Sequence, residues 1–159
     1  MKSLSILIVC FLSLSVISAS NTFQCGSHIC REKSTCVNSE KCVLPFTDVK
    51  IEQLIVHRWF DQQNPGELNL MVNVSIINIG HNQLSDIVIG TFINDAEILL
   101  GGIIDKVEGV TLDYQKNIIK PLSDICLEPG DVFHFGYSKG GSIPAILYIK
   151  DTTVKSIKY

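Results

Sequence analysis

Nine consecutive residues, 68–76, alternate between apolar side chains and mostly polar ones. The apolar positions are Leu68, Leu70, Val72, Val74 and Ile76, and the positions between them are Asn69, Met71, Asn73 and Ser75. Successive side chains of a β-strand point to opposite faces of a sheet, so this pattern predicts a strand with one buried and one exposed face. Such a face must pack against a second layer, which limits the chain to folds that cover a sheet on one side.

Similar short apolar runs separated by turns continue along the chain. The predicted strands are residues 50–60, 68–79, 86–93, 96–104, 132–137 and 145–150, with a weaker segment at 107–123. Turns are indicated by Pro65-Gly66, Asn94-Asp95 and Pro129-Gly130. No segment has a sustained helical period. The pattern predicts an all-β fold, a two-sheet antiparallel β-sandwich preceded by a small disulfide-stapled segment, with a barrel as the alternative.

Alternation also assigns the faces of the last two strands. Phe133, Phe135 and Tyr137 share one face, which we expect in the core. In the final strand the core positions are Ala145, Leu147 and Ile149, which leaves Tyr148 outside.

The first long strand carries the only tryptophan of the chain, Trp59. One face holds Leu54, Val56 and Phe60, interrupted by Arg58, and the other holds Gln53, Ile55, His57 and Trp59. The first face is the more apolar, so Phe60 is expected inside and Trp59 outside. A β-bulge would exchange the two faces.

Residues 1–20 have the features of a secretory signal peptide. Lys2 provides a positive start, an apolar stretch follows, and small residues at 18–20 suit cleavage. An uncleaved anchor is the alternative. The chain is therefore expected outside the cell, in a wall or matrix. Its formal net charge of −3 comes with no basic run, so we expect no nucleic-acid partner and, once the signal is removed, no membrane.

Residues 21–46 contain four closely spaced cysteines, Cys25, Cys30, Cys36 and Cys42. In an oxidising compartment they are expected to form two disulfides, and their spacing leaves all three pairings open. A zinc site is disfavoured because no C-x-x-C pair is present. Cys126 stands alone; we expect a buried thiol, with a disulfide link to a partner chain as the alternative.

Three segments in order resemble carbohydrate-binding module family 49: "IEQLIVHRWF", "VNVSIINIGHNQLSDIVIG" and "LEPGDVFHFGY…IPAILYI". The family's late motif matches Leu127, Pro129, Gly130, Phe135, Gly136 and Tyr137, with Asn78 after the second strand and Trp59 closing the first. The resemblance covers about residues 48–150. It implies that residues 47–159 form a sandwich that binds cellulose through exposed aromatics. Arg58 departs from the family's usual Ser or Thr, and a second tryptophan is missing from the middle region.

The resulting hypothesis is a non-catalytic protein that binds cellulose or a related β-glucan, without a cofactor or metal. The predicted carbohydrate-binding residues are Trp59, His57, Gln53, Tyr114 and Tyr148. Asn73-Val74-Ser75 is a glycosylation sequon on the outward face, where a glycan would obstruct binding. The alternative is an adhesion or signalling module that binds protein through the cysteine-rich segment. A glycosidase is disfavoured because a small sandwich has little room for two carboxylates in a cleft.

Overall fold

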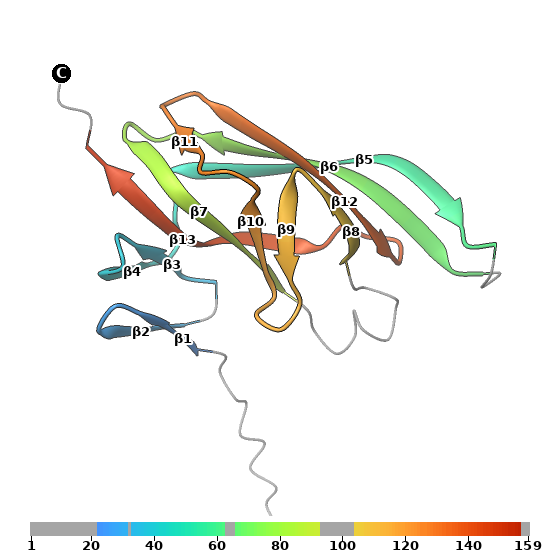
Figure 1. Ribbon diagram of the computed structural model, residues 1–159, viewed down its shortest axis with the longest axis horizontal. Helices are drawn as coiled ribbons and strands as arrows, with labels where there is room; N and C mark the ends of the chain where they lie inside the picture. Colours follow the sequence, from blue (N-terminus) through green and yellow to red (C-terminus); the bar gives the residue numbers. More distant parts are fainter. Residues whose placement is uncertain (1–21, 32, 63–65, 93–103, 157–159) are drawn as a thin grey trace, which may run out of the picture.

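The computed structural model describes residues 22–31, 33–62, 66–92 and 104–156 (Figure 1). The predicted signal peptide, the turn residues at 63–65 and 94–95 and most of the predicted strand 96–104 lie outside these ranges. The strands of the described residues are β1 Thr22–Cys25, β2 His28–Arg31, β3 Thr35–Val37, β4 Lys41–Val43, β5 Val49–Phe60, β6 Leu68–Asn78, β7 Gln83–Phe92, β8 Ile104–Glu108, β9 Val110–Asp113, β10 Ile118–Pro121, β11 Cys126–Leu127, β12 Val132–Gly140 and β13 Ile146–Lys155.

Two sheets pack face to face, as the alternation predicted. One sheet has four strands in the order β5-β6-β12-β8, all antiparallel. The other has seven, in the order β4-β3-β13-β7-β10-β9, with β11 also paired to β7. A separate hairpin, β1–β2, lies beside β3 and β4 in Figure 1. The predicted all-β sandwich with a disulfide-stapled segment before it is confirmed.

The core lies between the sheets and follows the predicted faces of three strands. Leu70, Val72, Val74 and Ile76 of β6 are fully buried. Phe135 and Tyr137 of β12 and Ala145 and Ile149 at β13 complete this apolar layer, with Phe133 and Leu147 partly buried against it. Tyr148 faces outward as expected, because its neighbours on either side point into the core.

The face assignment of β5 was wrong over the first part of the strand. Ile51 and Ile55 pack against the core, whereas Leu54 is 66% exposed. The register of β5 against β6 shifts between Ile55 and His57, so Val56 is the extra residue of a bulge. The bulge exchanges the faces, and beyond it the predicted phase holds: Trp59 pairs with Asn69 on the outer side.

Phe60 is also not the buried anchor that alternation predicted. It pairs with Leu68 on the core side of the sheet, but 67% of its surface is exposed. In Figure 1 the ends of β5 and β6 extend beyond the other labelled strands, so none of the described strands of the second sheet lies over this position. The predicted face of Phe60 was therefore right, but its predicted burial was wrong, because the β5–β6 hairpin extends past the other described strands.

The cysteine-rich segment is joined to the sandwich. Cys25 pairs with Cys36, and Cys30 pairs with Cys42. Strand β3 runs parallel to β13, and Thr35 Oγ1 donates to the Ile149 carbonyl 2.5 Å away. Closing loops of 11 and 12 residues contributes about 3 kcal/mol per bridge in the chain-entropy picture. Residues 21–46 therefore supply two strands to the larger sheet.

Cys126 is exposed, so the expectation of a buried thiol was wrong. Its neighbour Leu127 is 5% exposed and points into the core from β11. Alternation along this two-residue strand turns Cys126 outward, opposite Ser85 of β7.

Candidate functional site

The outer face of the four-stranded sheet carries three adjacent rows of side chains near the C-terminal end of β5. Cross-strand partners lie on the same face of a sheet, so the register defines each row. The rows are Trp59–Asn69–Gly140, His57–Met71–Ser138–Lys106 and Leu54–Asn73–Gly136–Glu108. With strands about 4.8 Å apart, a row across four strands is roughly 14 Å wide.

Trp59 and His57 form a pair of stacked rings at one end of this face. Their centroids are 5.6 Å apart and their planes differ by 14°. Trp59 is half-buried and His57 is exposed. Because His57 covers one face of the indole, at most one face is open to a sugar ring. The structure thus brings together two of the five predicted binding residues.

A shallow groove of about 270 Å³ lies beside this pair. Its lining residues are Met71, Asn73, Lys106, Val107, Glu108, Gly136, Tyr137 and Ser138. Gly136 forms the floor, since a Cβ there would lie 3.8 Å from both Asn73 Oδ1 and Glu108 Cβ. Its sequence signal was the outward position of a glycine between two core aromatics, which the prediction did not use.

Gln53 was predicted on the face of Trp59, and the structure places it on the opposite one. Its Nε2 donates to the Ala145 carbonyl at 3.0 Å, and its Oε1 accepts from the Tyr137 hydroxyl at 2.6 Å. The same hydroxyl accepts from the Ala145 N–H at 2.8 Å. This closed set of bonds links the two sheets. The bulge at Val56 is the reason that Gln53 and Trp59 do not share a face.

The two predicted tyrosines also lie away from Trp59. Tyr114 sits at the turn between β9 and β10, 55% exposed, with its hydroxyl donating to the Asp105 carbonyl at 3.0 Å. Tyr148 is on the outer face of the seven-stranded sheet, where its ring covers Gly90 of β7. The five predicted residues therefore do not form a single platform.

The sequon residue Asn73 is exposed and lines the groove. A glycan attached there would stand in the row of Leu54, Asn73, Gly136 and Glu108, next to Gly136. The predicted obstruction therefore applies to the groove itself, and any binding on this face depends on the state of Asn73.

Three of the residues that carried the family resemblance, Asn78, Leu127 and Gly130, meet at one corner of the sandwich. The buried Asn78 donates through Nδ2 to the carbonyls of Asn82 and Leu127, each at 2.8 Å. Its backbone carbonyl accepts from Gly130, where φ is +90°. An asparagine here satisfies the backbone of two loops, so this part of the motif has a structural role.

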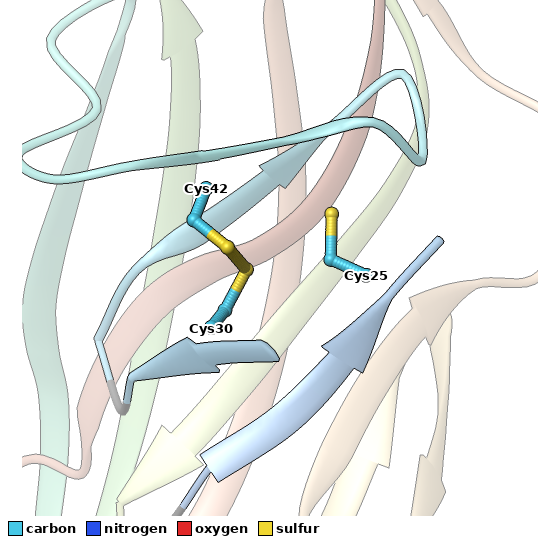
Figure 2. A group of neighbouring side chains, drawn as sticks. All are labelled: Cys25, Cys30 and Cys42. Atoms are coloured by element: carbon cyan, nitrogen blue, oxygen red, sulfur yellow. A yellow bond between two sulfur atoms is a disulfide. The ribbon is translucent and has the colours of Figure 1, made fainter. Parts of the chain in front are cut away.

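Three sulfur atoms of the cysteine cluster lie within 4.8 Å of one another, from Cys25, Cys30 and Cys42. Figure 2 shows the Cys30–Cys42 bridge with the Cys25 sulfur beside it. Cys25 is bonded in turn to Cys36. Because all these sulfurs are in disulfides, none is a thiolate that could bind a metal.

Comparison with protein-family models, curated proteins and solved structures finds no match to the chain in any of the three. Within the described ranges, no helix has the length and apolar character needed to cross a membrane.

Proposed function

We propose that the chain is a non-catalytic secreted protein that binds cellulose or a related β-glucan on the outer face of its four-stranded sheet. The observation that carries this is the position of Trp59, which the bulge in β5 turns outward beside the groove over Gly136. The apolar C–H faces of a β-linked glucose suit stacking on an indole. The resemblance to carbohydrate-binding module family 49 points to the same residue.

The polar groups of the adjacent rows suit sugar hydroxyls. Asn69 and Asn73 offer amide donors and acceptors, and Ser138 offers a hydroxyl. Covering about 100 Å² of apolar surface at Trp59 is worth roughly 2.5 kcal/mol before the costs of association. A single open indole face therefore suits weak binding to one chain, which repetition along an insoluble polymer would strengthen.

The test is sedimentation of the mature protein with microcrystalline cellulose, using Ser75→Ala as the parent, which removes the sequon and keeps Asn73. Trp59→Ala is expected to lower the apparent affinity for cellulose at least tenfold, which corresponds to about 1.4 kcal/mol of binding free energy. Phe60→Ala is the matched control, because it is the adjacent aromatic and lies on the other side of the same strand. If the parent does not sediment, or both alanine variants bind equally, Trp59 is not the platform.

A second candidate is a protein-binding module that acts through the cysteine-rich segment. It is favoured by Ile29, which is 69% exposed on the β1–β2 hairpin, and by the exposed thiol of Cys126. Non-reducing electrophoresis separates the two candidates. A disulfide-linked species that disappears in Cys126→Ser would support this second function.

A further inference from the structure

A second groove, also of about 270 Å³, lies on the outer face of the seven-stranded sheet. Its lining residues are Phe23, Gln24, Val88, Lys116, Ile118, Lys120, Lys150 and Asp151. They come from β1, β7, β10, β13 and the turn before β10. The β1–β2 hairpin supplies Phe23 and Gln24, so the groove is formed jointly by that hairpin and the sandwich.

The groove is basic although the chain as a whole is acidic. Three lysines line it, Lys116, Lys120 and Lys150, against one carboxylate, Asp151. The formal net charge of the whole chain is −3. Among the described residues only Lys116 of the three is in an ion pair, a loose 3.7 Å contact with Asp113. Asp113 and Asp151 offset part of the charge of the three lysines, and the groove keeps a net positive charge.

Lys150 is the most enclosed of these cations. Its Nζ lies 5.4 Å from the centroid of the Phe23 ring, within the range of a cation–π contact. Burial lowers the pKa of Lys150, and the nearby charge of Lys116 lowers it further, while Asp113 opposes them. An anion bound next to this ammonium would favour its charged form and so offset the effect of burial.

Apolar surface accompanies the charge. Phe23 forms one wall, and Val88 and Ile118 lie on the floor, next to the ring of Tyr148 over Gly90. A ligand that fits must therefore present both an anionic group and an apolar face. A hexopyranose with a carboxylate or sulfate has both, in a unit small enough for the groove.

An extended peptide fits this surface less well. Peptides that pair with a sheet do so along an open edge, where backbone N–H and C=O groups are available. This groove lies over the middle strands β13, β7 and β10, whose backbones already pair with one another. Recognition there must come from side chains.

We propose that this groove binds an anionic sugar residue of a polysaccharide, with the lysines holding its carboxylate or sulfate and Phe23 packing against its ring. Asp151 lies opposite Val88 at the groove, where it accepts a hydrogen bond from a sugar hydroxyl. This site is on the other sheet from Trp59 and does not depend on the proposed glucan binding.

The test is isothermal titration of the full mature protein with three probes. They are a trimer of galacturonic acid, its neutral methyl ester and a sulfated oligosaccharide of similar size. The acid or the sulfated probe is expected to bind, more weakly as salt is raised, and the ester is not. The anionic probe that binds more tightly shows whether the groove prefers a carboxylate or a sulfate. Equal binding of the ester, or no binding of either anion, would overturn the proposal.

Lys150→Gln is expected to weaken binding of the anionic probe about tenfold, since it removes the enclosed charge. Lys155→Gln is the matched control, because Lys155 is exposed on the same strand outside the groove and its loss leaves affinity unchanged. Trp59→Ala should also leave affinity unchanged, which separates this site from the glucan face. Equal losses in both lysine variants would show non-specific charge attraction and refute the site. A fourth titration uses a hexaglutamate peptide, and tighter binding of this peptide than of either anionic sugar would refute the choice of ligand.

Discussion

Removing the hydroxyl of Tyr137 should cost the fold far more than removing any exposed tyrosine hydroxyl. Tyr137 is 2% exposed, and its hydroxyl bonds to both Gln53 Oε1 and the Ala145 N–H. In Tyr137→Phe the Ala145 N–H is left without this acceptor in a residue that is 5% exposed. A buried polar group that loses its partner costs about 1–3 kcal/mol.

Gln53 Oε1 loses its donor in the same variant, but Gln53 is only half-buried and water can replace part of that bond. The expected loss in free energy of unfolding is therefore about 2–3 kcal/mol. For a chain of this size it corresponds to a fall in Tm of roughly 5–10 °C.

The measurement is equilibrium unfolding in urea with the disulfides intact, followed by the fluorescence of Trp59. Tyr114→Phe is the matched control, because it makes the same chemical change at a residue that is 55% exposed. Water can replace its single bond to Asp105, so its loss should stay within about 0.5 kcal/mol. Equal losses in the two variants would refute the inference that the Tyr137–Gln53–Ala145 bonds link the sheets.

Three further predictions concern the stability of the fold. Gly90→Ala should lower the free energy of unfolding by about 1 kcal/mol, because the added Cβ would lie 2.3 Å from Tyr148 Cζ. In a double-mutant cycle with Tyr148→Ala, this loss should vanish when the tyrosine ring is absent. Asn78→Ala should lose at least ~2 kcal/mol in urea unfolding, because two carbonyls lose their donor; an unchanged midpoint would contradict that role. Burial, with a smaller contribution from Asp86, raises the pKa of Asp151 above 3.8. The charged carboxylate therefore lowers the free energy of unfolding at neutral pH. This loss becomes smaller as the pH falls through the raised pKa towards 3.8, because the group is then protonated in both the folded and the unfolded chain. Asp151→Asn should therefore be more stable than the natural chain at pH 7, with a difference that shrinks in acid; a difference independent of pH would refute this.

The sequence by itself determined the strands and the core faces wherever alternation ran without interruption. Residues 68–76, Phe135, Tyr137 and Ile149 lie where the period of two placed them. These positions were predictable because the pleat of a strand leaves only two directions for a side chain, and burial favours the apolar one.

The tertiary structure decided the features that alternation cannot predict, namely the faces beyond a bulge and the contacts between different segments. The extra residue at Val56 resets the phase of β5, so Gln53 and Trp59 belong to opposite faces although they are six positions apart. The union of β3 with β13 and the groove beside Phe23 join parts of the chain that are far apart in sequence, and the disulfide pairing depends on how the β1–β2 hairpin packs on β3 and β4. A local pattern contains no information about such partners, because their contacts form only when the two sheets and the cysteine-rich hairpin have packed together.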